Sequence, residues 1–290
     1  MHTPVLLNEV LEYLNSKPNQ NFIDATVGDG GHAKAILEKT APNGKLIAID
    51  RDLDSVIRAK SNLRRFGNRV LFINDSFGNI LKIVKNSGLD QIKGILFDFG
   101  MSTSQLENSG KGFSFQKDEV LDMRYDAKIP ITAENILNDY SETELFRIFK
   151  KLGEEPKSKI IIKAIVNARE KKRIKTTKEL VGIIEKVLRR RGKLHPATLV
   201  FQALRIEVNQ ELVEIEKALA DLPKVLSSNG RIAFISFHSL EDRLIKNWVK
   251  DLSKKNIIKI LNKKPLTASA EELKANPKSR SAKLRVIEKI

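Results

Sequence analysis

The sequence predicts a doubly wound α/β fold that is interrupted by an all-α domain. In the first hundred residues, short and continuously apolar segments alternate with helical ones, which is typical of a parallel sheet covered on both faces. The alternation stops after residue 98, helical patterns follow, and an apolar segment at 231–237 resumes it. We therefore expect a discontinuous α/β domain over 1–107 and 209–290, with an inserted helical domain over 108–208.

Seven segments have the length and composition of buried strands. Each is short, rich in Ile, Val, Leu and Phe, and bounded by polar residues or glycine. The expected strands are residues 22–27, 45–50, 69–73, 94–98, 231–237, 257–261 and 284–288.

The expected helices have recognisable start signals, such as a capping residue, a capping box or a proline in the first turn. Residues 101–126 have no clear periodicity, so we expect an ordered loop there. The expected helix starts are Pro4 after a Thr3 cap, the capping boxes Ser141 to Glu144 and Thr176 to Glu179, Pro196 at the head of a long stretch through Leu219, and Ser239.

The composition is that of a globular protein. The chain has 290 residues, 41% of them hydrophobic and 30% charged, which is enough to build a substantial core. Its longest apolar runs fall far short of the ~20 residues that a membrane helix needs. The first residues show no basic stretch followed by an apolar one, so we expect no signal peptide and a cytoplasmic protein.

The lack of cysteine excludes several kinds of catalytic and metal site. With no Cys in the chain, thiolate nucleophiles, Cys zinc sites, iron-sulfur clusters and disulfides are excluded. The four histidines are far apart in the sequence and lack the spacing of metal ligands, so no metal site is expected.

Positive charge is concentrated in two segments. The whole chain carries +16, residues 141–195 hold 17 basic and 7 acidic residues, and residues 243–290 hold 14 and 4. Each segment therefore has a net charge of +10, and the remainder is slightly acidic. This distribution predicts a polyanionic partner, because Lys and Arg release counterions when they neutralise phosphates. A solvated basic surface without a partner is the alternative.

The ends of the expected strands carry acidic residues. Asp24, Asp50, Asp75 and Asp98 each lie at or just after a strand end, and glycines at 28, 30 and 31 follow the first strand. In an open parallel sheet, ligands bind at the carboxyl ends of the strands. Glycines permit a tight turn, and an acid 20 positions past Gly30 can accept both ribose hydroxyls. These features predict a nucleoside-containing cofactor.

Two cofactors compete for this site. The pattern Gly28-x-Gly30-x-x-Ala33 fits a loose dinucleotide fingerprint, which would make the protein a nicotinamide-dependent enzyme. Asp24 and Asp29, however, bracket the turn, and carboxylates disfavour a pyrophosphate at the helix start. They suit the ammonium and sulfonium of S-adenosyl-L-methionine better. A glycine-rich turn without a ligand is the remaining alternative.

Two segments in the last third are also polar. Residues 238–242 contain His, Ser and acids, but adjacent residues seldom converge into a hydrolase triad. We expect Ser239 to cap a helix and His238 to contact substrate or a loop. Residues 276–285 combine hydroxyls with bases, which fits phosphate contacts or a flexible basic tail.

Several blocks along the chain, from residue 2 to residue 285, form one recognisable series. The blocks are His2 to Leu7, Asp24 to His32, Asp98 to Ser102 with Gln105 and Leu106, Gly112 to Phe115, Leu121 to Arg124, His195 to Thr198 with Phe201 to Ile206, Phe237 to Arg243, and Asn276 to Arg285. Together they resemble the bacterial ribosomal small subunit methyltransferase H family. Departures from the family pattern are Thr103, Lys111, Tyr125 and Leu199, and Leu199 replaces a charge that could contact RNA.

The resemblance implies a class I, Rossmann-like methyltransferase with a helical insert that engages substrate. The implied reaction is methylation of the N4 amine of a cytidine in the decoding region of 16S rRNA, with S-adenosyl-L-methionine as the donor. The resemblance also implies that Asp50 takes the ribose hydroxyls and that Phe77 lies near the adenine. The implied cofactor-binding residues are Gly30, Gly31, His32, Asp50, Phe77, Asp98 and Gln105.

Methylation of an exocyclic amine needs no covalent intermediate, unlike methylation at cytosine C5, which uses a Cys nucleophile. We predict that Asp98 positions cofactor and amine. Phe113 and Phe115 are either stacking platforms for the base or, as we favour, core residues. The predicted RNA contacts are Lys171, Lys172, Arg173, Arg189, Arg190, Arg191, Arg205, His238 and Arg280.

The expected partner is 16S rRNA, within the small subunit or an assembly intermediate. The sequence leaves a monomer and a homodimer both open. A non-catalytic RNA-binding module is the third class of function, but it leaves the acidic strand ends unexplained.

Overall fold

The computed structural model describes residues 4–188 and 195–290. The chain divides into two compact units: Met1–Met101 with Leu212–Ile290, and Ser102–Glu211. The second unit lies between the two parts of the first along the chain. It is slightly longer than the 108–208 insert expected from the sequence, because an additional helix begins at Thr103.

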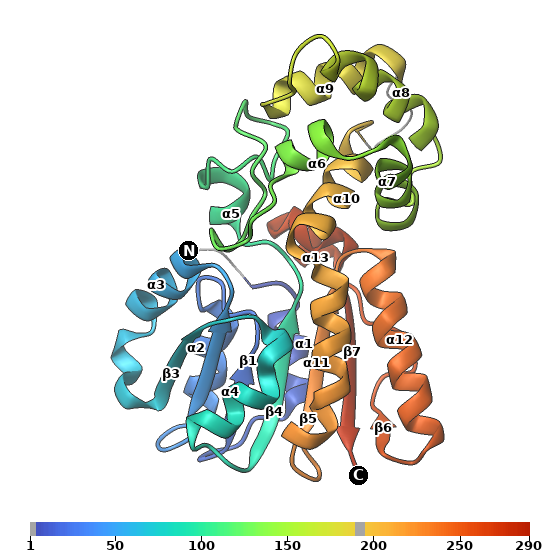
Figure 1. The fold of residues 1–290 in the computed structure, drawn as a ribbon. Helices are drawn as coiled ribbons and strands as arrows, with labels where there is room; N and C mark the ends of the chain where they lie inside the picture. Colours follow the sequence, from blue (N-terminus) through green and yellow to red (C-terminus); the bar gives the residue numbers. More distant parts are fainter. Residues whose placement is uncertain (1–3, 189–194) are drawn as a thin grey trace. The chain divides into compact units, whose positions relative to one another are not determined.

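The first unit contains a seven-stranded sheet in the order β3-β2-β1-β4-β5-β7-β6 (Figure 1). Strands β1 to β5 are parallel to one another, and β7 runs antiparallel to both β5 and β6. All seven expected strands are therefore confirmed. Their bounds are β1 Asn21–Asp24, β2 Leu46–Asp50, β3 Val70–Asn74, β4 Ile92–Asp98, β5 Arg231–Ser236, β6 Ile258–Ile260 and β7 Lys283–Lys289.

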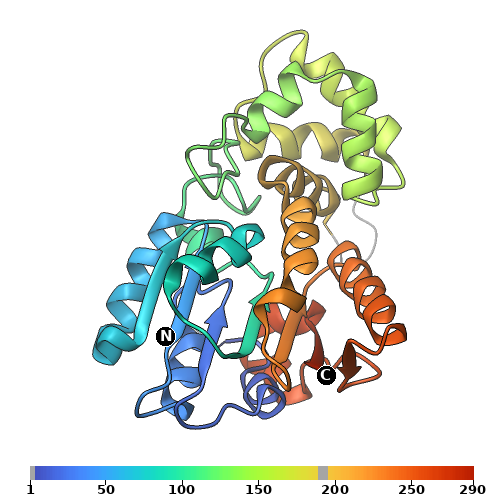
Figure 2. The same ribbon diagram turned by 60° about the horizontal axis from the view of Figure 1, so that its bottom comes forward.

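Helices cover both faces of this sheet, as Figure 2 also shows. Alternate residues of a strand point to opposite faces, so Ile95 and Phe97 join one core while Leu96 joins the other. Because both faces are buried, the central strands are continuously apolar. One face is covered by α1 Leu7–Leu14, α2 Gly31–Lys39 and α3 Leu53–Asn62, the other by α4 Ile80–Ser87, α11 Glu211–Val225 and α12 Ser239–Lys254.

The order of the strands reverses at β1. This strand pairs with β2 on one side and with β4 on the other, through Ile23 opposite Ile47 and Ile95. The connections that leave β1 and β4 therefore run to opposite sides and open a crevice at the carboxyl ends of the strands. The short elements of this unit are η1 Arg64–Arg69, η2 Phe77–Asn79, α13 Ala270–Ala275 and η4 Pro277–Ser281.

The second unit is helical. Both capping boxes expected from the sequence, Ser141 with Glu144 and Thr176 with Glu179, are confirmed at the starts of α7 and α9. Leu145 of α7 and both Leu180 and Ile184 of α9 are fully buried. The bounds are α5 Thr103–Asn108, α6 Ala133–Asp139, α7 Glu142–Arg147, the π-helix η3 Ile148–Leu152, α8 Ser158–Arg169, α9 Thr177–Val187 and α10 Thr198–Asn209. No helix among the described residues is long and apolar enough to cross a bilayer.

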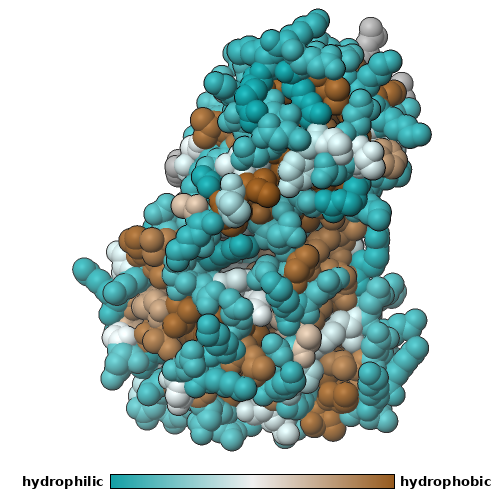
Figure 3. Space-filling model, viewed as in Figure 1, coloured by the Kyte–Doolittle hydropathy of each residue, from teal (hydrophilic) through white to brown (hydrophobic). Residues whose placement is uncertain are grey.

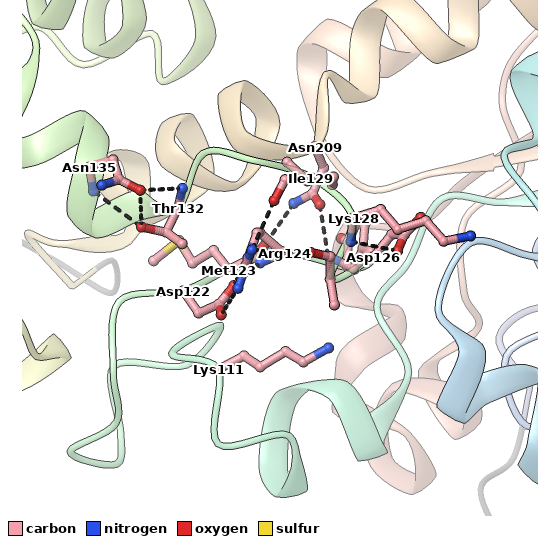
Figure 4. Close-up of polar contacts among 12 residues, drawn as sticks. Lys111, Asp122, Met123, Arg124, Asp126, Lys128, Ile129, Thr132, Asn135 and Asn209 are labelled. Atoms are coloured by element: carbon pink, nitrogen blue, oxygen red, sulfur yellow. Dashed lines mark hydrogen bonds and ion pairs between the residues drawn. The ribbon is translucent and has the colours of Figure 1, made fainter.

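A loop of the second unit is fixed by buried and partly buried polar contacts (Figure 4). The Arg124 guanidinium donates to both carboxylate oxygens of Asp122 at 2.7 and 2.9 Å. Although burial opposes it, this pairing holds the pKa of Asp122 below its usual value. The buried Asn209 side chain donates to the Met123 carbonyl at 2.7 Å and accepts from the Tyr125 N–H at 2.9 Å. These bonds hold Met123 at a φ of 59°.

Four sequence expectations for the helices are wrong. The first helix begins at Leu7, because Leu6 adopts a left-handed conformation, and the expected Thr3 cap lies outside the described residues. The loop expected over 101–126 contains α5, whose capping box of Ser102 and Gln105 was a readable signal. The long stretch after Pro196 is two helices, since the left-handed Gln210 separates α10 from α11. The cap of α12 is His238, and Ser239 is the first helical residue.

Candidate functional site

Three carboxylates of the first unit lie at the carboxyl ends of neighbouring strands. Asp24 ends β1, Asp50 ends β2 and Asp98 ends β4. Thr26 links two of them, because its hydroxyl accepts from the Asp98 N–H at 2.7 Å and its N–H donates to Asp24 Oδ1 at 3.2 Å. The sheet thus brings together acids that are up to 74 positions apart in the sequence. Thr26 was not among the predicted site residues, and only its position after β1 could have suggested it.

Asp24 is almost completely buried, with 1% of its surface exposed. Burial, with a smaller contribution from the charges of Asp98 and Asp50, raises the pKa of its carboxyl to about 7. Hydrogen bonds from the Thr26 and Ala33 N–H groups work in the opposite direction. Near neutral pH this carboxyl is therefore close to half protonated, and a bound cation would shift it toward the ionised form.

Asp50 is held in one orientation by backbone donors. Its Oδ2 accepts from the Gly28 N–H and its Oδ1 from the Asp52 N–H, each at 2.9 Å. Burial raises its pKa to about 6, against the effect of these two bonds. A carboxylate has about four acceptor positions, so two remain for other donors. The geometry suits a pair of hydroxyl groups such as those of a ribose.

The turn after β1 is built for close approach. Gly28 and Gly30 have φ values of 51° and 85°, which favour glycine. A Cβ on Gly31 would lie 2.5 Å from Pro4, and one on Gly30 would lie 3.1 Å from Leu63. Since the Asp24 carboxylate accepts from the Ala33 N–H, it occupies the N-terminus of α2. A pyrophosphate would meet a carboxylate there, which disfavours the dinucleotide alternative.

One part of the sequence argument for this turn is wrong. Asp29 was expected to act with Asp24 on a cationic cofactor. Its carboxylate instead pairs with the Arg58 guanidinium at 2.8 Å, and Arg58 also bonds to Ser55. The charge of Asp29 is therefore balanced within the first unit, and the cation-attracting charge of the site comes from the strand ends.

His32 lies beside Asp98. Its Nδ1 is 3.8 Å from Asp98 Oδ2, and its Nε2 is 3.0 Å from the Val5 carbonyl oxygen. The contact with a carbonyl requires a proton on Nε2, so Nδ1 is the atom that can exchange a proton next to Asp98. Asp98 also accepts from the Gly100 N–H at 3.0 Å, which orients its carboxylate.

Phe77 begins η2, directly after β3. Its half-buried ring packs edge-on against Phe97 and Phe99, with centroids 5.7 Å apart in both pairs. These contacts fix the ring, which remains partly exposed. Six of the seven residues implied to bind cofactor lie in the first unit. Gln105 lies in the second, where its side chain accepts from the Ser102 N–H at 3.0 Å.

The two aromatic residues of the loop have internal partners. Phe113 is buried and stacks on Tyr125 at 5.2 Å, while Phe115 stacks on His195 at 4.6 Å and meets Phe201 edge-on. The core interpretation is therefore confirmed for Phe113. Tyr125, where the family usually has Met, is accommodated by this stacking.

The predicted RNA contacts fall into different environments. Lys171 and Arg280 are exposed. Lys172 pairs with Glu179 at 2.8 Å, and Arg173 bonds to Asp139 at 2.7 Å and Glu134 at 3.3 Å. Arg205 forms a largely buried pair with Glu211, and the partly buried His238 caps α12 through its Nδ1. The predictions at Arg189, Arg190 and Arg191 lie outside the described residues.

The sequence matches the model of the MraW methylase family over residues 1–290. The chain belongs to this family. It is 48% identical over 288 residues to a ribosomal RNA small subunit methyltransferase H of Sulfurihydrogenibium sp., covering 98% of both chains. It is 46% identical over 292 residues to the protein of the same name from Sulfurihydrogenibium azorense, covering 100% of this chain and 99% of the other. The resemblance noted from the motifs is thereby confirmed.

Structural similarity to solved proteins is more distant. An rRNA methylase from Streptococcus thermophilus aligns over 100% of this chain and 99% of its own, with a TM-score of 0.47 and 10% identity. At that level the solved structure adds nothing to the family assignment.

As a member of a methylase family, the protein uses S-adenosyl-L-methionine as its cofactor. The strand-end site fits this molecule. It offers carboxylates to a sulfonium, an ammonium and ribose hydroxyls, and it has glycines where a Cβ would collide with neighbouring side chains.

Proposed function

We propose that this protein methylates the N4 amine of a cytidine in the decoding region of 16S rRNA. Support for a small subunit rRNA substrate comes from relatives at 41 to 48% identity, which are named for that activity. The choice of the cytidine amine rests on the family resemblance of the motifs, together with the absence of Cys. The observation that carries the chemistry is the group of three carboxylates at the ends of β1, β2 and β4.

We assign the cofactor contacts to the residues implied by the motifs. Asp50 binds the ribose hydroxyls, Phe77 lies against the adenine, and Gly30 and Gly31 allow close backbone approach. His32 and Asp98 complete the set within the first unit, and a contact from Gln105 is what the motifs imply. When bound, the cofactor supplies an electrophilic methyl group on a positively charged sulfur.

Asp98 then acts on the substrate amine. Its carboxylate accepts a hydrogen bond from the amine N–H, which orients the nitrogen and increases the electron density of its lone pair. The proton that the amine loses passes to Asp98, and His32 at 3.8 Å can share it. No covalent intermediate between protein and base is required.

The RNA is bound by cations outside the strand-end site, among which Lys171 and Arg280 are exposed. The target base must leave its stack to reach the carboxylates, as in other enzymes that modify bases. We place the reaction in the cytoplasm, on the small subunit or an assembly intermediate.

The test uses tritiated S-adenosyl-L-methionine and small ribosomal subunits from cells that lack the activity, followed by mass spectrometry of the RNA nucleosides. N4-methylated cytidine is the expected product. Label at another position would overturn the assigned atom. If the protein bound cofactor but transferred no label to rRNA, the assignment of rRNA as the substrate would be wrong.

A further inference from the structure

The positively charged residues of the second unit differ in whether they already bond to acceptors within the protein. The five arginines that the structure describes in this unit all bond to protein acceptors. Arg124, Arg147, Arg173 and Arg205 pair with carboxylates, and Arg169 donates to the carbonyls of Leu137 and Tyr140. These contacts orient the guanidinium groups, and in the four carboxylate pairs an internal acid offsets the positive charge.

A different set of residues presents unpaired charge. Lys150 lies in η3, and Lys159 and Lys163 lie one turn apart on α8. All three are exposed, and none has an ion-pair partner among the described residues. The α8 helix contains no acidic residue. The nearest acids on α7 are in its first turn, where Glu144 is bonded to Ser141.

Apolar side chains are interleaved with these lysines. Phe146 on α7 is 36% exposed and Ile160 on α8 is 48% exposed. The Lys159 ammonium lies 5.9 Å from the centroid of the Phe146 ring, which places the two helices' exposed faces side by side. We call Phe146, Lys150, Lys159, Ile160 and Lys163 the lysine face. In Figure 3 the surface of this unit is mostly hydrophilic, with only isolated hydrophobic patches.

The backbone between α7 and α8 has an unusual conformation at this face. Residues Ile148–Leu152 form a π-helix, in which the Gly153 N–H donates to the Ile148 carbonyl five residues earlier at 3.3 Å. Such turns are rare and occur frequently at functional sites. Here the turn keeps Ile148 and Phe149 buried while Lys150 stays exposed.

We infer that the lysine face binds single-stranded RNA, with a base stacked on Phe146 and phosphates bound by Lys150, Lys159 and Lys163. Single-strand binding surfaces combine an aromatic platform with surrounding cations, and this face has both. Because none of the three lysines forms an ion pair with a described residue, their charges are available to a polyanion such as RNA. This inference rests on the proposed rRNA substrate, and it assigns recognition to residues other than the Lys171 to Arg173 cluster.

The test compares two double variants of the full chain that each remove two positive charges from the second unit. Lys159→Gln with Lys163→Gln removes unpaired cations. Lys172→Gln with Arg173→Gln removes cations that are already paired and serves as the matched control. The probe is a fluorescein-labelled oligoadenylate of about 12 nucleotides, within the range that one binding surface covers. Its affinity is measured by anisotropy over a series of salt concentrations.

We expect the first double variant to reduce the slope of log affinity against log salt by about 1.4, the value for two phosphate contacts on a single strand. The control should change the slope by clearly less. Phe146→Ala should weaken binding of the single strand by about tenfold and leave binding of a duplex of equal length almost unchanged, because a paired base cannot stack on the ring. Circular dichroism and cofactor affinity should be the same for all variants.

An unchanged slope in the first variant, or a larger change in the control, would overturn the assignment. Loss of binding to small subunits with unchanged binding to RNA would assign the face to a ribosomal protein instead. If these variants bind RNA normally while the wild type methylates small subunits, only this inference fails. If the wild type binds cofactor but neither binds nor methylates RNA, the proposed function fails as well.

Discussion

The two units of this protein treat charge in opposite ways. In the first, carboxylates lie at the end of a buried sheet, and burial raises the pKa of Asp24 to about 7 and that of Asp50 to about 6. In the second, the described arginines bond to acceptors within the protein, while lysines on η3 and α8 face solvent. A buried acid near its pKa responds strongly to one bound cation, whereas exposed lysines respond to a polyanion and to salt. The net charge of the chain does not by itself show which unit responds to a cation and which to a polyanion.

The largest effect is expected at Asp98. Asp98→Asn keeps the shape of the side chain but removes the charge that accepts the amine proton, so turnover at saturating cofactor should fall by about 100-fold or more. Methyl transfer to small subunits measures this. Asp54→Asn, on the exposed first turn of α3, is the matched control and should keep full turnover. Near-normal turnover of Asp98→Asn would remove Asp98 from the chemistry.

The second prediction asks whether the units depend on different interactions. Asn209→Ala removes the hydrogen bonds to the Met123 and Arg205 carbonyls and from the Tyr125 N–H, so the free energy of unfolding should fall by about 2 kcal/mol. Urea unfolding measures the loss. Asn167→Ala, at an exposed position of α8, should have almost no effect. Cofactor affinity of the folded Asn209→Ala protein should be unchanged, and a parallel loss of affinity would contradict the separation.

The third prediction concerns pH and the charge of the ligand. Because Asp24 and Asp50 are partly protonated below pH 7, affinity for the cationic S-adenosyl-L-methionine should rise by roughly tenfold between pH 5.5 and 8. S-adenosylhomocysteine has a neutral sulfur, so its affinity should rise less. Calorimetric titration of both ligands measures the difference. If the two affinities depended equally on pH, Asp24 and Asp50 would not interact with the sulfonium charge.

The same pKa values predict the stability of the cofactor-free protein. The folded state holds a proton on Asp24 up to about pH 7, whereas the unfolded state loses it near 3.8. The free energy of unfolding should therefore decrease as the pH rises between these values, and Asp24→Asn should flatten that decrease. Thermal unfolding across this range provides the measurement.

The smallest effect is expected in the glycine turn. Gly30→Ala imposes a side chain at a φ of 85° and 3.1 Å from Leu63, so it should cost about 1 kcal/mol of stability and weaken cofactor binding. Gly88→Ala imposes a similar φ of 67° with nothing within 4 Å. It should lose a comparable amount of stability and bind cofactor normally. Equal cofactor affinities would mean that the turn only closes the junction between β1 and α2.

The sequence by itself determined the seven strands, the two capping boxes and the helical character of the insert. These features depend on local apolar periodicity and on residues a few positions apart, which can be read from one chain. The acidic strand ends were also readable, because parallel strands place their carboxyl ends at a common edge.

Only the tertiary structure decided which charges are available. Asp29 and Arg58 are 29 positions apart, and Arg173 and Asp139 are 34 apart, so no local pattern shows that they neutralise one another. The sequence singled out the densest cationic cluster, in which Lys172 and Arg173 are paired, and passed over the dispersed lysines of α8. Burial and pairing depend on segments brought together by folding, and these set both the pKa of Asp24 and the free charge of the lysine face.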